Sequence, residues 1–275
     1  MTCWQLKRTQ VGQYQIAYVD EGTGLPVLFV HGFPLDHSMW QNQIRALADK
    51  CRVLAPDLPG FGASSPITAE VMRMEDFADT LAGFLDAVGV NEPIVYCGLS
   101  MGGYIAWQFW RRYPSRLRAL ILCDTRAGAD PPEVADQRRV NANRVLNEGP
   151  DFFVDMMIPR LFAPAQVAQN SPLVQEMREV MRKTPRQSIA AALRGMAERP
   201  DARPWLGEIA LPTLVLVGQE DALSTPAEME TIAAAIRGSQ FTLIPGAGHL
   251  APLENPQAVN AALGQFLETL AGAGC

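Results

Sequence analysis

Short, almost continuous runs of apolar residues recur along the chain, separated by longer segments whose apolar residues have helical spacing. Such runs are typical of strands buried on both faces, and the segments between them predict helices that cover a parallel sheet. The sequence therefore predicts an α/β fold with a mostly parallel, eight-stranded sheet and helices on both faces. The expected strands are residues 4–10, 13–20, 26–30, 52–56, 93–97, 117–123, 212–218 and 240–245, and the expected helices outside residues 128–204 are 40–48, 74–88, 103–113, 226–237 and 256–270.

The pattern changes in the middle of the chain, where strand-like runs disappear. Helix-like pieces broken by prolines follow one another over residues 132–148, 150–161, 172–183 and 186–198. Proline ends or starts helices, so these pieces are expected to be separate short helices. The sequence predicts a helical cap of residues 128–204 inserted after the sixth strand, with residues 1–127 and 205–275 forming the α/β core.

One stretch combines a predicted strand, a sharp turn and a predicted helix. The turn has the sequence Gly98-Leu99-Ser100-Met101-Gly102, which matches the G-x-S-x-G pattern of a nucleophile elbow. A serine on such a turn needs neighbours without side chains, and Gly98 and Gly102 meet that need. We expect Ser100 to be a nucleophile, whereas the competing interpretation is an ordinary glycine-serine loop.

A serine hydroxyl needs a base, and the chain has three histidines, His31, His37 and His249. His249 lies in a glycine-flanked loop after the last strand, and the order Ser, Asp, His along the chain favours it as the base. Two aspartates, Asp124 and Asp221, follow strand ends and compete for the role of the acid that orients the histidine. We favour Asp221 because it follows the last long strand before His249, and Asp124 remains the alternative.

Backbone N–H groups are expected to stabilise the oxyanion that forms during acyl transfer. Met101 directly follows the serine, and Phe33 lies in the loop after the third strand, so their N–H groups are the predicted donors. His31 is expected to hold that loop in shape, and His37 to belong to the loop or to the rim of the pocket.

Aromatic and methionine residues of the predicted cap are candidates for the substrate pocket. At helical spacing, core packing is the more common role for any one of them, and substrate contact is the alternative. The residues predicted to line the pocket are Trp40, Phe152, Phe153, Met156, Met157 and Phe162.

Composition and charge restrict the partners. The chain has a net charge of -6 and no basic run, which argues against nucleic acid and anionic membrane surfaces. No apolar stretch is long enough to span a bilayer, and the first residues lack the pattern of a signal peptide. The five cysteines are scattered and odd in number, which predicts neither disulfides nor a zinc site and favours the cytoplasm. The expected partner is a small-molecule ester or lactone, and the sequence predicts no oligomeric state.

These motifs together resemble those of α/β-hydrolase-fold serine hydrolases, over nearly the full length of the chain. The resemblance is to the branch of carboxylesterases, enol-lactonases and cofactor-free haloperoxidases. It implies an acyl-enzyme on Ser100 and no metal or organic cofactor. Related branches that open epoxides or remove halide have aspartate at the elbow, so Ser100 argues against them. The motifs are His31-Gly32-Phe33-Pro34, Asp57-Leu58-Pro59-Gly60-Phe61-Gly62, Gly98-Leu99-Ser100-Met101-Gly102-Gly103, Gly218-Gln219-Glu220-Asp221 and Gly248-His249.

The leading hypothesis is a carboxylesterase that acts on small to medium esters. An enol-lactonase is the second, and its carboxylate-bearing substrate would require a cation such as Arg126, Arg144 or Arg160. Perhydrolysis would use the same acyl-enzyme. A hypothesis of another class is a non-catalytic receptor or scaffold with this fold, because a fold by itself does not establish turnover.

Overall fold

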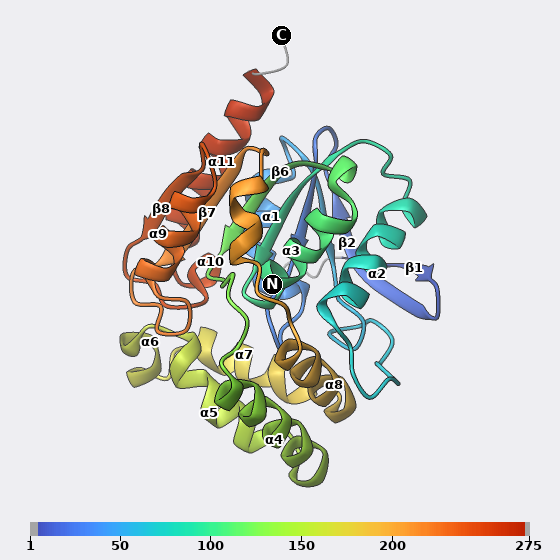
Figure 1. Cartoon of the computed structure of the whole chain (residues 1–275), viewed down its shortest axis with the longest axis vertical. Helices are drawn as coiled ribbons and strands as arrows, with labels where there is room; N and C mark the ends of the chain where they lie inside the picture. The colour runs from blue at the N-terminus through green and yellow to red at the C-terminus, as the bar shows by residue number, and fades with distance from the viewer. Residues whose placement is uncertain (1–4, 273–275) are drawn as a thin grey trace.

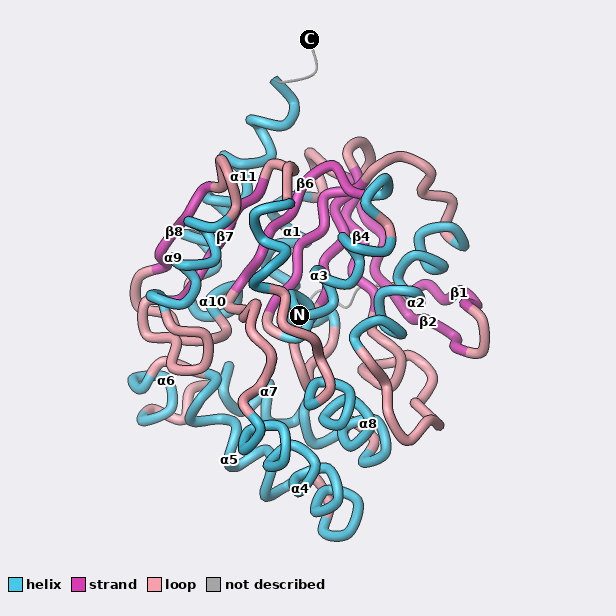
Figure 2. The backbone as a smooth tube through the Cα atoms, in the orientation of Figure 1, coloured by secondary structure: helices cyan, strands magenta, loops and turns pink. Residues whose placement is uncertain are grey.

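An eight-stranded sheet in the order β1-β2-β4-β3-β5-β6-β7-β8 forms the centre of the computed structural model, which describes residues 5–272 (Figures 1 and 2). The pairs β1–β2 and β2–β4 are antiparallel, and every other neighbouring pair is parallel. The predicted fold class is confirmed. The strands are β1 (Lys7–Val11), β2 (Tyr14–Glu21), β3 (Pro26–Val30), β4 (Arg52–Pro56), β5 (Ile94–Leu99), β6 (Leu117–Cys123), β7 (Thr213–Gly218) and β8 (Gln240–Ile244).

Helices cover both faces of the sheet, and each face has its own apolar core. On one face pack α1 (Gln41–Leu47) and α11 (Pro256–Gly272). On the other pack α2 (Met74–Ala87), α3 (Met101–Arg112) and α9 (Pro226–Ala235). The central strands β3 and β5 are buried along their whole length, as a sheet covered on both sides requires.

The parallel strands all end at the same edge of the sheet. Register pairs such as Val30 with Gly98 and Leu99 with Cys123 place the ends of β3, β5 and β6 side by side. The loops that follow β3, β5, β6, β7 and β8 therefore lie together, which is where ligands bind in sheets of this kind.

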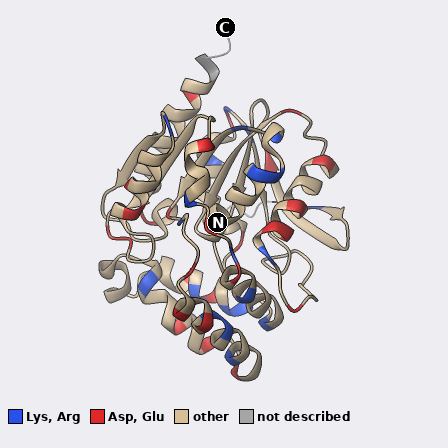
Figure 3. Ribbon diagram, in the orientation of Figure 1, with Lys and Arg blue, Asp and Glu red and all other residues tan. Residues whose placement is uncertain are grey.

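Helices without intervening strands connect β6 to β7 and gather beyond this edge of the sheet (Figure 1). We call residues 132–197 the helical insertion. Acidic and basic side chains both occur throughout it (Figure 3), and several form ion pairs such as Arg144 with Glu148. Its helices are α4 (Pro132–Glu148), α5 (Asp151–Leu161), α6 (Pro164–Ala168), α7 (Pro172–Lys183) and α8 (Arg186–Ala197), followed by the 3₁₀ helix η3 (Arg203–Glu208).

Over the described residues 5–272, each helix is too short or too polar to cross a membrane. Cys51, Cys97 and Cys123 are buried free thiols. Cys3 and Cys275, as well as the beginning of the first predicted strand at residue 4, lie outside the described residues.

Candidate active site

Ser100 occupies the turn between β5 and α3. Its backbone has φ 54° and ψ -111°, a conformation that is strained for any residue other than glycine. The strain is retained because the strand and the helix on either side hold the turn. The predicted strand-turn-helix geometry is therefore present at this serine.

Glycines surround Ser100 because backbone or packed side chains occupy the space that a Cβ would need. A Cβ on Gly98 would lie 2.5 Å from the carbonyl oxygen of Gly102, and one on Gly102 would lie 2.4 Å from that of Val30. A Cβ on Gly103 would meet Thr125 Oγ1 at 2.2 Å. Thr125 in turn donates a 2.7 Å hydrogen bond to the carbonyl of Ser100, so the turn is tied to the end of β6.

His249 and Asp221 form a buried hydrogen-bonded pair. His249 follows β8, Asp221 follows β7, and His249 Nδ1 lies 2.8 Å from Asp221 Oδ2. The other carboxylate oxygen of Asp221 accepts hydrogen bonds from the N–H groups of Leu223 and Ser224. Since an ionised carboxylate only accepts, Nδ1 carries the proton and Nε2 is left as the acceptor of a neutral imidazole. This is the tautomer that a general base requires.

Close backbone contact fixes the two loops that carry this pair. A Cβ on Gly218 would lie 2.0 Å from the carbonyl oxygen of Gly248. The N–H of Glu220 also donates a 2.8 Å hydrogen bond to the carbonyl of Ala247. The acid and the histidine are thus held by neighbouring turns packed against each other, and not by their own contact alone.

Asp124, the alternative acid, has a different role in the structure. Its carboxylate accepts a 2.8 Å hydrogen bond from the N–H of Gly218 at the end of β7. Burial, and next the negative charge of Asp221, raise the pKa of Asp124 well above its usual range. His249 Nδ1 is hydrogen-bonded to Asp221 and not to Asp124, whose Oδ1 accepts from Gly218, so the geometry favours Asp221 as the acid.

The N–H groups of Phe33 and Met101, the two predicted oxyanion donors, have no hydrogen-bond acceptor among residues 5–272. Over residues 5–272, the backbone hydrogen bonds include none donated by the N–H of Phe33. Met101 is the first residue of α3, so its N–H has no acceptor within the helix. A Cβ on Gly32 would lie 2.7 Å from Leu99 Cδ2, which shows how closely the loop after β3 approaches the turn.

His31 supports that loop, as the sequence predicted. Its Nδ1 lies 2.9 Å from the carbonyl oxygen of Gly32, and its Nε2 accepts a 3.0 Å hydrogen bond from the N–H of Leu58. Burial lowers the pKa of His31, consistent with a neutral ring that donates at one nitrogen and accepts at the other.

His37 pairs with Asp57 and belongs to the same loop region. Burial by itself would lower the pKa of His37, but the 2.7 Å hydrogen bond and the charge of Asp57 outweigh it and raise the pKa. With Asp36 these two residues form the group of possible metal ligands found among the described residues. Asp57 also accepts hydrogen bonds from the N–H groups of His37 and Ala63, so its oxygens already serve to fold this loop.

A cavity of about 300 Å³ lies between the ends of the strands and the helical insertion, and Ser100 and His249 both line it. Phe153, Met156 and Met157 contribute to its wall from α5, as does Phe33 from the loop after β3. The sequence did not single out Tyr104, Leu193 and Met196, which also line it. Leu193 and Met196 are three residues apart on one predicted helix, a spacing that could have been used.

Trp40, Phe152 and Phe162 do not line this cavity, so these three pocket predictions are corrected. Trp40 is 0% exposed and packs against Phe29, with a distance of 4.9 Å between the ring centroids. Phe162 is buried in the core on the α11 face. The guanidinium of Arg144 lies over the ring of Phe152, 3.8 Å from its centroid. Adjacent helical residues point in directions about 100° apart, so Phe153 faces the cavity and Phe152 does not.

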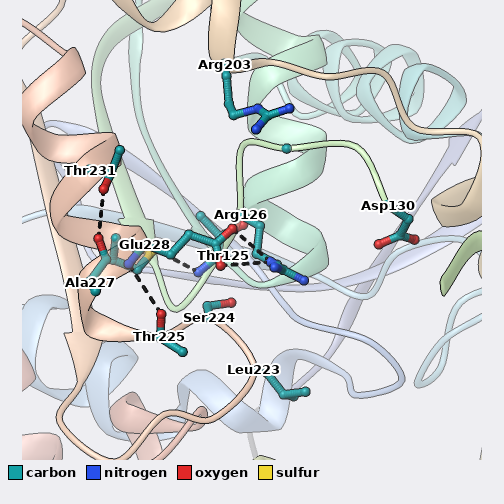
Figure 4. A network of polar contacts seen from close by, with 12 residues as sticks. Thr125, Arg126, Asp130, Arg203, Leu223, Ser224, Thr225, Ala227, Glu228 and Thr231 are labelled. Atoms are coloured by element: carbon teal, nitrogen blue, oxygen red, sulfur yellow. Dashed lines mark hydrogen bonds and ion pairs between the residues drawn. The ribbon is translucent and has the colours of Figure 1, made fainter. Parts of the chain in front are cut away.

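Three arginines reach the cavity, and two of them are already paired. Arg126 Nε lies 2.9 Å from Glu228 Oε1, and Figure 4 shows the two side chains pointing toward each other. Arg138 pairs with the buried Asp130. Among the described residues, Arg160 has no ion-pair partner. Of the arginines considered from the sequence, Arg144 lies outside the cavity and Arg160 is the uncompensated cation within it.

Comparison with known proteins identifies the family of this fold. The family model described as alpha/beta hydrolase fold matches residues 26–256. The chain belongs to the alpha/beta hydrolase family. This alpha/beta hydrolase is 29% identical over 231 residues to 3-oxoadipate enol-lactonase 1 of Acinetobacter baylyi, covering 84% of each chain.

Two solved structures have closely similar folds. A thermophilic esterase from Thermogutta terrifontis, in a malate-bound structure, is 47% identical with a TM-score of 0.93, covering 97% of this chain and 99% of the esterase. The enol-lactonase from Burkholderia xenovorans LB400 is 27% identical with a TM-score of 0.88, covering 95% of this chain and 100% of the lactonase. The family assignment makes this chain an α/β-hydrolase-fold hydrolase. The cavity lined by Ser100 and His249 is its candidate active site.

Proposed function

We propose that this alpha/beta hydrolase is a serine hydrolase that cleaves carboxylic esters of small to medium size through an acyl-enzyme on Ser100. The observation that carries the proposal is the buried His249–Asp221 pair, which shares one cavity with the strained Ser100 turn. A nucleophile, a base and a group that orients the base are the components of acyl transfer by a serine. The helical insertion would act as a cap whose α5 supplies an apolar wall for the acyl or alcohol group.

The first half of the reaction forms the acyl-enzyme. His249 Nε2 takes the proton of the Ser100 hydroxyl as its Oγ attacks the ester carbonyl carbon. The resulting oxyanion accepts hydrogen bonds from the N–H groups of Phe33 and Met101, and the negative Asp221 stabilises the imidazolium. His249 then gives its proton to the alkoxide oxygen as the carbon–oxygen bond breaks and the alcohol leaves.

The second half releases the acid. Water enters beside the acyl group, loses a proton to His249 Nε2 and attacks the acyl carbon. The second oxyanion collapses, His249 returns the proton to Ser100 Oγ, and the carboxylic acid leaves. Every proton moves between substrate, water, Ser100 and His249, so this reaction requires no metal or organic cofactor.

A second candidate is hydrolysis of a carboxylate-bearing enol-lactone, for which Arg160 would hold the free carboxylate. The uncompensated charge of Arg160 at the cavity and the names of the lactonase relatives favour this candidate. A neutral ester gains little from a free guanidinium, whereas a carboxylate gains a charge-assisted hydrogen bond of about 1.5–3 kcal/mol.

A comparison of substrates tests the two candidates. Hydrolysis of p-nitrophenyl esters from acetate to decanoate is measured beside lactones that include a carboxylated enol-lactone. Fast turnover of short or medium esters, unchanged in Arg160→Gln, supports the esterase. Preference for the charged lactone, with its KM raised about tenfold to a hundredfold in Arg160→Gln, supports the lactonase instead. Arg182→Gln on α7 is the matched control, because Arg182 is paired with Asp151 and does not line the cavity.

The two aspartates are expected to differ strongly when replaced by asparagine. Asp221→Asn should lower kcat for ester hydrolysis about a thousandfold or more, because an amide neither favours the correct tautomer nor stabilises the imidazolium. Asp124→Asn should cost less than about tenfold, since its side-chain oxygen can still accept from Gly218. Steady-state kinetics of both variants provide the test, and the reverse ranking would move the acid to the end of β6.

A further inference from the structure

Glu254 joins the loop of His249 to the helical insertion. It is the last residue of α10 (Ala251–Glu254), and its carboxylate is largely buried. Oε1 accepts a 2.9 Å hydrogen bond from the N–H of Gly248, the residue before His249. Oε2 accepts a 2.7 Å hydrogen bond from the N–H of Ala163, in the link between α5 and α6. One carboxylate therefore bridges two segments that are far apart in the sequence.

Two further contacts hold the same segments together. The N–H of Leu250 donates a 3.1 Å hydrogen bond to the carbonyl of Leu161, the last residue of α5. A Cβ on Gly248 would lie 2.5 Å from the backbone nitrogen of Ala163, so the insertion runs directly against the histidine loop. The end of α5 that meets this loop also carries Arg160 and Leu161, which line the cavity.

We propose that Glu254 is a positioning residue. It fixes the position of the cavity-lining helix α5 relative to the His249 loop, so that a substrate bound in the cavity is correctly placed relative to the imidazole. The proposal rests on the proposed role of His249 as the base. Its physical content is that the ionised carboxylate accepts from both N–H groups at once. Without it, only the Leu250–Leu161 hydrogen bond and the packing of Gly248 against Ala163 hold the two segments, so α5 and the imidazole can shift relative to each other. Shifts of about 1 Å cost up to about a hundredfold in rate.

The ionisation of Glu254 makes its two bridging hydrogen bonds, from Gly248 and Ala163, dependent on pH. Burial raises the pKa of Glu254 to about 7, although the hydrogen bonds from the N–H groups of Ala163 and Gly248 oppose the shift. Three charged or titratable groups lie near Glu254. The charge of Glu220 raises the pKa of Glu254 further, and the charge of Glu254 raises that of Asp124. The third is the His249–Asp221 pair, next to Gly248. A protonated carboxyl presents an O–H toward one of the two N–H donors. Both bridging hydrogen bonds are therefore present above about pH 7, and one of them is lost as the pH falls through this value.

The test is the pH profile of kcat/KM for hydrolysis of a short ester, measured by pH-stat titration in the wild type and in Glu254→Gln. In the wild type, protonation of Glu254 lowers the rate in addition to the loss of the base, so the acid limb should be steeper than a single ionisation allows. In Glu254→Gln the limb should have the slope of one ionisation. At pH 8 its kcat should be about tenfold to a hundredfold below wild type. Glu254→Asp keeps the charge but is too short to reach both N–H groups, so it should lower kcat and lose the steep limb, as Glu254→Gln does.

Controls separate the possible results. Glu268→Gln removes an exposed carboxylate on α11 and should leave rate and slope unchanged. Thermal unfolding by circular dichroism shows whether each variant is folded; if Glu254→Gln does not fold, the aspartate variant carries the test. Wild-type rate and slope in Glu254→Gln, or a wild-type kcat in Glu254→Asp, would overturn the inference while leaving the proposed function intact. If the wild type itself hydrolyses no ester, it is the proposed function that fails.

Discussion

Replacing Ser100 by alanine is expected to lower kcat for ester hydrolysis by about 10⁴-fold or more. The variant has no atom that can form the acyl-enzyme, although the oxyanion donors and the cavity remain. The fold should be retained, because the turn depends on Gly98, Gly102 and Gly103 and on the hydrogen bond from Thr125 to the backbone of residue 100. Alanine and serine both have a Cβ and are strained to the same degree at a positive φ. The substitution therefore leaves the backbone strain of the turn unchanged. Steady-state rates with p-nitrophenyl butyrate and thermal unfolding of the same samples provide the measurement.

A labelling experiment shows whether the loss of activity reflects a missing nucleophile. A fluorophosphonate probe should label the wild type and the control Ser115→Ala, in which an exposed serine after α3 is removed, but not Ser100→Ala. No labelling of the wild type, together with no turnover of any ester or lactone, would favour a receptor or scaffold. Labelling of folded Ser100→Ala would place the nucleophile elsewhere.

Replacing His249 by alanine is expected to lower kcat to a similar extent, about 10⁴-fold or more. Ser100 is then left without a base, and Asp221 is left buried without its imidazole partner. The protein should still fold, because Asp221 keeps the hydrogen bonds from the N–H groups of Leu223 and Ser224. Thermal stability should nevertheless fall, since a buried carboxylate that loses its partner is costly.

Chemical rescue distinguishes a missing base from a disturbed site. The space left by the side chain opens on the cavity, so added imidazole should restore part of the activity of His249→Ala and none of that of Ser100→Ala. Near-normal ester hydrolysis by His249→Ala without imidazole would refute the assignment of the base. The other two histidines are poor substitutes, because His31 uses both ring nitrogens in the oxyanion loop and His37 pairs with Asp57.

Local patterns in the sequence were sufficient to predict the sheet, most helices and the region of the candidate site. Continuous apolar runs identify the buried strands, and strand-helix alternation determines that most of them are parallel. The ends of parallel strands then meet at one edge, which brings Ser100, Asp221 and His249 into one region before any coordinate is known. Two helices escaped prediction, α6 (Pro164–Ala168) and α10 (Ala251–Glu254), since four or five residues are too few to show a helical period.

Contacts between distant segments decided what the pattern left open. Phe152 and Phe153 are equally apolar, and only the docking of α5 sets which one faces the cavity. Asp124 and Asp221 both follow strands, but only Asp221 is hydrogen-bonded to His249, and burial beside the charge of Asp221 raises the pKa of Asp124. The charge of Arg126 is cancelled by Glu228, a residue 102 positions later in the chain, and Glu254 reaches Ala163 across 91 positions. Periodicity and turn chemistry are local, so the sequence by itself determined the framework and the candidates for the reacting groups. Side-chain direction, burial and charge pairing arise between segments far apart in the chain, and the tertiary structure alone decided them.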